Sequence, residues 1–429
     1  MKKENTPTLR FDPLRRAGSE TLQSAVIALA TYLETEEQRL RLRRRARRPA
    51  DQRSFRAALD AIACNLLVAA MVSKDAAVSV PRGHDAIWGK GRYSNPVFGK
   101  QFILILDLLE RLGLIRTITR GFRVSASRRQ ETRVRPTKRL SQHLPCGETV
   151  WGDFDFEQRM ETIVLRPPKS ADDYDAIDYK ETRNTRRWRC EMHDINQWLH
   201  DAPLSILQTG PTASIDEHGQ PIDPCRRSLR RVFNNGDWRQ GGRLFGGFWQ
   251  SMKREDRFEL LRIADEPVAN VDYEQLFPRL AYARALREQP IGDLYDVTGD
   301  SSSRDGWKQL INALLFTTRP LKQWPSETRQ HFTDTSLKSA LDAILRKHGP
   351  IAKLFNKGLG FNLMRIESDM LVSVLIALFK AGVPALPLHD SVLVPLSKAD
   401  AAKSSMQAEF TLRTGSSRGI VKVQLPPIL

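Results

Sequence analysis

The stretch PLHDSVLVP, residues 387–395, constrains the fold more than any other part of this chain. A His–Asp pair lies between two apolar flanks. The upstream flank ends in a Gly-Val-Pro turn, and the downstream flank, VLVP, is typical of a short buried strand. A carboxylate between buried strands is costly unless something pairs with it. The pattern therefore predicts a hairpin with Asp390 at its turn and a positively charged partner beside it.

A second carboxylate, Asp272, lies in the stretch VANVDYEQLFPRLAYA, residues 268–283. A short apolar run carries it to the end of an expected strand, and a helix-like stretch follows. Taken alone, an aspartate at such a junction is more often a helix N-cap. With Asp390 it forms a pair of carboxylates on adjacent strand edges, which repel each other unless cations lie between them. Two-metal phosphoryl transfer uses such a pair, with Mg²⁺ ions about 3.5–4 Å apart.

A third stretch, RDGWKQLINALLF (304–316), predicts a helix with one distinctive face. Arg304, Lys308, Asn312 and Phe316 recur every four residues, so a helix presents all four on the same side. Two cations one turn apart suit a triphosphate, and the next turns would then face the sugar and base. Taken alone, the Arg–Lys pair is better explained as a solvated basic face.

Together these stretches resemble motifs of the family A DNA polymerases, whose relatives include the single-subunit RNA polymerases. DYEQLFPR (272–279) is similar to the first palm motif, DYSQIELR, with Asp, Tyr, Gln and Arg in register. Arg304 and Lys308 match the fingers motif RRxxKxxNFGxxYG, and Phe316 stands at its tyrosine. Residues 389–391, His-Asp-Ser, are similar to the last palm motif, HDE in the DNA polymerases and HDS in the RNA polymerases.

Two further segments extend the resemblance. GGRL (241–244) resembles the family's TGRL, with Gln250 at the glutamine of PNLQN, and DLYDVTG (293–299) resembles DIHTxTA. Each motif is modest alone. The five elements occur in family order over about residues 240–410, and this order makes the set specific.

The resemblance implies a role for each matching residue. Asp272 and Asp390 would be catalytic and would bind two Mg²⁺ ions, which Mn²⁺ could replace, with the Tyr273 carbonyl as a further ligand. Arg304 and Lys308 would bind the triphosphate of the incoming nucleotide. The residues that select base and sugar would be Phe277, Asn312 and Phe316. Contacts to primer and template would come from Arg243, Gln250, Arg279 and His389.

The chain departs from the family where the sugar is selected. Phe277 replaces the glutamate that excludes ribose in the DNA polymerases, and a bulky ring there could block a 2′-hydroxyl by contact. Ser391, in contrast, matches the RNA polymerases. Deoxynucleotides are favoured, but the sugar preference stays open. No exonuclease-like carboxylate set precedes these motifs, so we expect no proofreading.

The N-terminal part has the element order of a winged helix-turn-helix domain. A packed helix over 54–72 is followed by a loop to about residue 97, a helix over 98–115 and a basic β-hairpin over 115–136. A small α+β domain for protein contacts is the alternative. Arginines cluster in and around the hairpin, at positions 116, 120, 123, 128, 129, 133 and 135. We predict DNA binding by Arg120, Arg123, Arg128 and Arg129.

Charge and composition limit the class of protein. Residues 39–48 hold seven arginines in ten positions, and such a run is either a solvated helix end or a phosphate-binding arm. The formal net charge of +17 predicts a polyanionic partner.

Four scattered cysteines without C-x-x-C spacing argue against a zinc site or a disulfide framework. No uninterrupted apolar run approaches a membrane span, and the N-terminus lacks the apolar core of a signal peptide, so we expect a cytoplasmic protein that binds no membrane.

The expected architecture is an α+β fold, in which a winged-helix-like domain precedes a right-hand polymerase palm and fingers with an antiparallel palm sheet. The expected segments are a basic helical arm (1–50), the winged-helix-like domain (51–145), a connecting or thumb-like region (146–240), and the palm and fingers (241–429, with the fingers at about 285–355).

The expected function is that of a small DNA polymerase without proofreading, serving a plasmid, phage or mobile element. Its expected partners are primer-template DNA, an origin duplex, nucleoside triphosphates and accessory replication proteins. Two alternatives stay open. One is a non-catalytic DNA-binding replication or regulatory protein. The other is an RNA polymerase or primase-like enzyme on the same palm.

Overall fold

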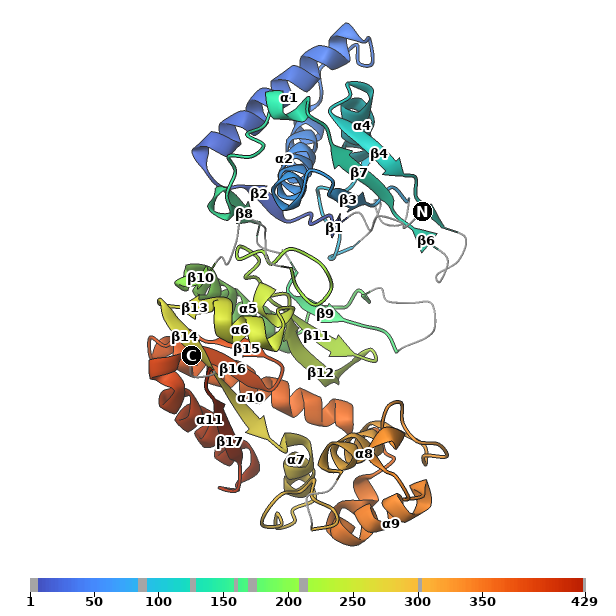
Figure 1. Cartoon of the computed structure of the whole chain (residues 1–429), viewed down its shortest axis with the longest axis vertical. Coiled ribbons are helices and arrows are strands. Elements are labelled where there is room, and N and C mark those ends of the chain that lie inside the picture. Colours follow the sequence, from blue (N-terminus) through green and yellow to red (C-terminus); the bar gives the residue numbers. More distant parts are fainter. Residues whose placement is uncertain are drawn as a thin grey trace. The chain divides into compact units, whose positions relative to one another are not determined.

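The computed structural model describes residues 7–83, 91–123, 129–157, 161–168, 176–207, 215–299 and 303–426. Internal contacts divide the chain into two compact units, each built from separate stretches of sequence. The first unit comprises Met1–Glu161, Ile206–Ser228 and Gly246–Leu260, and the second comprises Thr162–Ser205, Leu229–Phe245 and Leu261–Leu429. Both units contain helices and β-sheets, which confirms the mixed α+β class (Figure 1).

The two units divide the chain differently from the four expected segments. Residues 1–50 belong to the first unit rather than to a separate arm, and the region 146–240 is shared between both units. Residues 246–260, expected in the palm, also belong to the first unit. Local sequence patterns predict the elements, whereas these divisions depend on which distant stretches pack together.

The first unit is built on a four-stranded sheet with the strand order β1-β3-β7-β4. Strand β1 is parallel to β3, and the other two pairs are antiparallel. The strands are β1 (Thr8–Arg10), β3 (Ala77–Val80), β4 (Ile115–Thr119) and β7 (Thr132–Pro136). The main helices are α1 (Glu20–Arg39), α2 (Pro49–Val72) and α4 (Lys100–Arg111). Helix α2 packs on β3, β7 and α4, and α4 packs on β4 (Figure 1).

Helix α2 supplies the core of this unit. It begins at Pro49, whose missing N–H costs nothing in the first turn, and every side chain from 61 to 69 is buried. Among the described residues, α2 is the one helix long and apolar enough to cross a membrane, and 67% of its apolar window is buried. A core helix of a soluble protein meets the same criterion, so α2 alone is weak evidence for a membrane segment.

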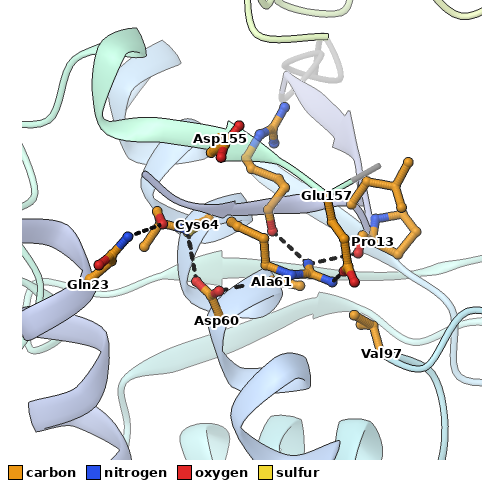
Figure 2. A network of polar contacts seen from close by, with 12 residues as sticks. Pro13, Gln23, Asp60, Ala61, Cys64, Val97, Asp155 and Glu157 are labelled. Carbon is orange, nitrogen blue, oxygen red and sulfur yellow. Dashed lines mark hydrogen bonds and ion pairs between the residues drawn. The ribbon is translucent and has the colours of Figure 1, made fainter. Parts of the chain in front are cut away.

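Smaller elements complete the first unit: β2 (Arg15–Ala17), β5 (Phe122–Arg123), β6 (Arg129–Gln130), η1 (Leu140–Gln142), η2 (Trp151–Asp153), β8 (Phe154–Phe156), η3 (Phe248–Gln250) and α6 (Arg254–Leu260). Figure 2 shows the polar network that joins β2 and β8 to α2. Asp60 accepts hydrogen bonds from the Ala17 N–H at 3.0 Å and from the Cys64 thiol at 3.5 Å. Arg16 pairs with Glu157, next to β8, and its Nε lies 4.0 Å from the Asp60 carboxylate of α2, so these charges also join the strand pair to the helix.

The arginine run at 39–48 forms a turn between two helices, not a helical arm. Helix α1 ends at Arg39 and α2 begins at Pro49. The side chain of Arg47 is 3% exposed, pairs with Glu37 at 2.5 Å and lies 3.7 Å from the centre of the Phe55 ring. Part of the run therefore closes the turn between α1 and α2 through ion pairs, while Arg41, Arg44, Arg45 and Arg48 stay exposed.

The second unit is built on a six-stranded sheet with the order β10-β13-β14-β16-β15, in which β17 also pairs with β14. Every described pairing of β14 and β16 is antiparallel. The strands are β10 (Leu204–Ile206), β13 (Leu261–Ile263), β14 (Glu266–Glu274), β15 (Leu386–Leu388), β16 (Ser391–Pro395) and β17 (Ile420–Gln424). Helix α11 (Ala399–Thr414) packs on β14, β16 and β17 (Figure 1).

The remaining elements of this unit flank the sheet. A smaller sheet is made of β9 (Ile163–Leu165), β11 (Arg230–Asn234) and β12 (Asp237–Phe245). The helices are α5 (Arg183–Asp201), α7 (Leu276–Arg284), α8 (Arg304–Phe316), η4 (Arg329–His331), α9 (Leu337–Lys347), η5 (Gly349–Leu354), α10 (Gly360–Lys380) and η6 (Leu396–Lys398). Helix α10 packs against β12, α11, α7 and α8, so it links the small sheet to the helices that follow β14.

Candidate active site

Two aspartates from neighbouring strands meet at one end of the central sheet. The antiparallel register of β14 and β16 places Asp272 opposite Ser391. Asp390 directly precedes Ser391, in the two-residue turn between β15 and β16. The hairpin expected around the His–Asp pair is therefore present, and all five residues of β16 are buried.

The turn that holds Asp390 has a constrained geometry. His389 has a φ of 60°, in the left-handed region that costs a non-glycine residue about 1 kcal/mol or more. The Ser391 hydroxyl donates a hydrogen bond to the Leu388 carbonyl at 2.9 Å, and Ser391 is buried. The serine that the sequence associates with RNA polymerases thus has a local structural role: it closes this turn.

Asp272 lies in an environment that disfavours its charge. Burial raises the pKa of Asp272 well above its usual range, the charge of Asp390 raises it further, and Lys308 acts in the opposite direction. Its Oδ1 atom is buried and has no hydrogen-bond partner among the described residues. A buried carboxylate oxygen without a donor is costly, so this position is suited to a bound cation.

A third carboxylate, Glu367 on α10, adjoins this pair. It is 1% exposed, and it binds Arg243 through two hydrogen bonds, at 2.6 Å to Nε and 2.8 Å to Nη2. Burial raises the pKa of Glu367 to about 7, although the Arg243 guanidinium lowers it. Because Asp390 also raises this pKa, the three carboxylates share one electrostatic site. Glu367 belongs to none of the sequence motifs, and its only signal in the sequence is a glutamate within a largely apolar helix.

The backbone before Arg243 explains the two glycines of GGRL. Gly241 and Gly242 have φ angles of 78° and 90°, and the pairing of β11 with β12 shifts register between Val232 and Phe233. This irregularity is a β-bulge, which glycine adopts without steric cost. A side chain at Gly242 would lie 3.0 Å from the Ser368 hydroxyl of α10. The glycines therefore let β12 approach α10, next to the pair of Arg243 and Glu367.

Helix α8 coincides with the predicted helix and presents the expected face. Arg304, Asn312 and Phe316 are partly exposed and Lys308 is exposed, whereas Trp307, Leu310, Ile311, Leu314 and Leu315 are buried. Lys308 makes no hydrogen bond or ion pair with the described residues, and its charge acts on Asp272. The Oδ1 atom of Asn312 is buried without a hydrogen-bond partner among the described residues. This face thus offers both a free cation and a free amide oxygen.

Arg304 is already paired. Its Nε donates to the Asp293 carboxylate, and its guanidinium carbon lies 5.6 Å from the centre of the Tyr295 ring. Tyr295 is 4% exposed, and burial followed by the charge of Asp390 raises its pKa. The segment around Asp293, which the sequence flagged only as a family-like stretch, therefore lies between the carboxylates and α8.

Buried hydrogen bonds fix this segment in place. Gln275, which follows β14 with a φ of 59°, accepts a hydrogen bond from the Leu294 N–H at 2.9 Å. His348 is fully buried; its Nε2 lies 2.9 Å from the Leu294 carbonyl, and its Nδ1 lies 3.1 Å from the Tyr282 hydroxyl. Burial lowers the pKa of His348 to about 4, so at neutral pH the ring is neutral and donates through Nε2. Hydrogen bonds therefore hold both the N–H and the carbonyl of Leu294, and this fixes the position of Asp293, the residue before it.

Two of the three predicted sugar- and base-selecting residues, Phe277 and Phe316, form an aromatic cluster with Phe361. The ring centres of Phe277 and Phe316 are 5.6 Å apart, and those of Phe316 and Phe361 are 5.1 Å apart. Gly360 makes room for this cluster, because a Cβ there would lie 2.5 Å from the Phe316 ring. The Arg243 guanidinium carbon is 5.9 Å from the centre of the Phe277 ring. Phe277 therefore lies between Arg243 and α8.

Two predicted primer or template contacts do not fit where their side chains lie. Arg279 is 2% exposed, and its guanidinium binds the Gln275 and Gln289 side chains and the Arg418 carbonyl. Because these internal contacts hold its guanidinium, the side chain is not presented to a bound primer or template. Gln250 belongs to the first unit, where its Oε1 accepts a hydrogen bond from the Gly246 N–H at 2.8 Å.

The predicted DNA-binding arginines of the first unit are only partly described. Arg120 is exposed beside the β5–β6 hairpin. Arg123 and Arg129 lie in the paired strands β5 and β6, and Arg128 lies outside the described residues.

Oxygen atoms are the available metal ligands at this site. No group of three or more His, Cys, Asp or Glu side chains in the described part of the chain is arranged to hold a metal ion. Asp272 and Asp390 are two, and Mg²⁺ is commonly bound by one or two carboxylates with water and substrate phosphates completing its coordination. The unpartnered Oδ1 of Asp272 fits such an ion.

No family model matches the chain, and no curated protein matches it. Among solved structures, it is similar to the POL domain of Pol1 from M. smegmatis, solved in complex with a DNA primer-template and dNTP. The identity is 10%, the match covers 56% of this chain and 51% of that chain, and the TM-score is 0.32. The chain thus spans about half the length of that structure. A TM-score this low supports no inference about activity.

Proposed function

We propose that the second unit is a template-directed nucleotidyltransferase, acting as a small DNA polymerase without proofreading. The observation that carries this proposal is the buried Oδ1 of Asp272, which has no hydrogen-bond partner among the described residues, on a carboxylate whose pKa Asp390 raises and Lys308 lowers. Adjacent carboxylates beside a cationic helix face are suited to metal-assisted phosphoryl transfer.

The metal ligands in this proposal are Asp272, Asp390 and the Tyr273 carbonyl, with Mg²⁺ as the ion and Mn²⁺ as a replacement. When bound, the ions would activate the attacking hydroxyl and stabilise the leaving oxygen. The donor set fits Mg²⁺, which prefers oxygen ligands.

The remaining residues bind and orient the substrates. Lys308 binds the triphosphate directly, since it has no competing partner among the described residues, and Arg304 joins it on leaving Asp293. Asn312 and Phe316 follow on the same face of α8 and contact the base and sugar. Arg243, oriented by Glu367, and the exposed His389 contact the primer end.

Primer extension on a DNA template with Mg²⁺ and deoxynucleotides tests the proposal. Wild type extends the primer, and Asp390→Asn lowers the rate by about 10³-fold or more, as loss of a central charge-stabilising group does. Asp400→Asn, a change at an exposed aspartate on α11, is the matched control and leaves the rate unchanged. Failure of wild type to extend, or extension by Asp390→Asn at the wild-type rate, would refute the proposal.

One observation favours a non-catalytic DNA-binding protein instead. Two of the three cations at the site, Arg243 and Arg304, are already neutralised by Glu367 and Asp293. If the protein is non-catalytic, the pairs Arg243–Glu367 and Arg304–Asp293 are permanent and no triphosphate binds. Stabilisation of wild type by a deoxynucleoside triphosphate, lost in Lys308→Ala, would exclude it.

We further propose that the first unit is a winged-helix DNA-binding module. Its element order is α2, β3, α4, β4, β7, and β7 lies between β3 and β4 in the sheet. Two helices followed by the strands β4 and β7, with the short β5–β6 hairpin between them, match the order of helix, loop, helix and basic hairpin that the winged-helix interpretation uses. The hairpin arginines, including Arg120, contact DNA in this proposal.

A further inference from the structure

The outer face of the first unit's sheet carries a concentration of arginines. Register fixes which residues share a row: Arg10 lies beside Ser79, and Ser79 lies opposite Arg133. The adjacent row on the other face, Leu9, Val78 and Val134, is buried. Because side chains alternate between the two faces, Arg10 and Arg133 lie on the face away from the core.

A second pair of arginines lies on the same face. Arg135 follows two residues after Arg133 on β7 and therefore points the same way, about 7 Å further along the strand. Register places Arg116 of β4 directly opposite Arg135. Cations directly opposite on neighbouring strands destabilise a sheet unless something neutralises them. Asp75 pairs with Arg135 at 3.1 Å, but neither Arg116 nor Arg133 has an acidic partner among the described residues.

Acidic side chains do not balance this face. Near it, Asp75 is used by Arg135, and Glu131 accepts a hydrogen bond from the Ser79 hydroxyl. Arg116 and Arg133, which have no acidic partner among the described residues, therefore make this face suited to binding an anion.

Helix α4, the element that would enter a DNA groove in most winged-helix modules, has a different surface. It exposes Lys100, Asp107, Glu110 and Arg111, so its charges cancel. Asp107 pairs with Arg82 at 2.6 Å, and Glu110 accepts a hydrogen bond from the Thr117 N–H at 3.2 Å. The two acidic side chains of α4 are therefore held in place. If α4 lay against a DNA duplex, they would repel its phosphates.

We propose that the outer face of the β1-β3-β7-β4 sheet, through Arg10, Arg116, Arg133 and Arg135, binds the phosphate backbone of duplex DNA, and that α4 does not. The four strands contain no aromatic residue. Single-strand binding relies on aromatic stacking platforms, so this face is suited to backbone phosphates instead of unpaired bases. The inference extends the proposed DNA-binding role of the first unit but does not depend on nucleotidyl transfer.

The test is binding of the full-length chain to a fluorescent duplex of arbitrary sequence, without nucleotide, over a series of salt concentrations. Arg116→Ser combined with Arg133→Ser lowers the slope of log K against log salt by about two, one for each lost phosphate contact. Lys100→Ser combined with Arg111→Ser removes the same charge from α4 and keeps the wild-type slope. A wild-type slope in the sheet variant, or an equal loss in the α4 variant, would overturn the proposal.

Two controls separate this result from misfolding and from failure of the proposed enzyme. Arg116→Ser alone removes one of two opposed cations, so its melting temperature is no lower than that of wild type. If the double variant does not fold, Arg10→Glu at the edge strand replaces it, and an unchanged slope there also contradicts the proposal. Asp390→Asn, inactive in primer extension, binds this duplex as wild type does.

Discussion

Arg243 and Glu367 form an ion pair with two hydrogen bonds, of 2.6 and 2.8 Å, although they are 124 residues apart in the sequence. The pair joins the bulged strand β12 to helix α10 beside the two aspartates. Glu367 is buried, whereas the side chain of Arg243 is 21% exposed. Arg243 therefore reaches solvent, and Glu367 holds its guanidinium in place.

Glu367→Gln tests this arrangement. The amide can accept one hydrogen bond from Arg243 but lacks the charge, so the free energy of unfolding falls by about 1–3 kcal/mol. Urea denaturation measures the loss. Glu409→Gln, which removes the exposed pair with Arg413 on α11, is the control and changes stability by less than about 0.5 kcal/mol. An equal fall in the free energy of unfolding for both substitutions would show that the buried pair stabilises the protein no more than the pair on α11 does.

Asp272→Asn is expected to stabilise the protein while abolishing primer extension. The substitution removes one of two neighbouring, partly buried carboxylates; desolvation and the charge of Asp390 raise the pKa of Asp272. In EDTA the free energy of unfolding rises by about 0.5–2 kcal/mol, as for other substitutions that relieve strain at a functional site.

Mg²⁺ provides the matching measurement for this variant. Added Mg²⁺ raises the melting temperature of wild type by mass action and leaves that of Asp272→Asn unchanged. A destabilised variant in EDTA would mean that Oδ1 of Asp272 has a partner in solution.

The carboxylate pair and the α8 face could be predicted from sequence because each depends on a local pattern. Alternating apolar residues place Asp272 and Asp390 at strand ends, and the spacing of four residues places Arg304, Lys308, Asn312 and Phe316 on one side of a helix. The partners of these residues could not be predicted. Glu367 and Asp293 approach Arg243 and Arg304 only through the packing of α10 and the loop before α8.

Motif matching also gave Arg279 a role that its burial does not allow. The residue stands in register with a family motif, but side-chain direction depends on the packing of α7, which no spacing rule encodes. The arginine run at 39–48 illustrates the same limit. Its charge is evident in the sequence, and Arg39 pairs with Glu36 three residues before it on α1, whereas Glu37 becomes the partner of Arg43 and Arg47 only when the turn between α1 and α2 forms.

Asp293→Asn is expected to release Arg304 for the nucleotide. The asparagine keeps the acceptor that binds the Tyr295 N–H but loses the charge that holds the guanidinium. Because the triphosphate no longer competes with a carboxylate, KM for the deoxynucleotide falls by about threefold to tenfold, with a smaller change in kcat. Steady-state primer extension measures both. Arg304→Ala, which removes the contact, raises KM; a rise in KM for Asp293→Asn as well would mean that Asp293 positions Arg304 for binding.

His348 gives the protein an acid-sensitive anchor. Its folded pKa, about 4, lies below the unfolded value of about 6.5, so the unfolded chain binds the proton more readily. Stability is full above pH 6.5 and falls as the pH drops towards 4. At pH 5 the loss is about 2 kcal/mol. Urea denaturation at pH 7.5 and pH 5 measures it, and His348→Gln lacks this component of the pH dependence. If the stability of His348→Gln depends on pH as that of wild type does, groups other than His348 cause the acid sensitivity.

Phe277→Gly tests whether a ring excludes ribose. Phe277 lies between Arg243 and Phe316, where the sugar of an incoming nucleotide would reach it if Arg304 and Lys308 hold the triphosphate. Removing the ring opens space for a 2′-hydroxyl, so the ratio of kcat/KM for ribo- over deoxynucleotides rises by at least about tenfold, equivalent to roughly 1.4 kcal/mol of discrimination. Phe316→Leu, which alters the neighbouring ring but keeps Phe277, is the control and shifts the ratio less. An unchanged ratio in an active Phe277→Gly enzyme would rule out a steric gate at this position.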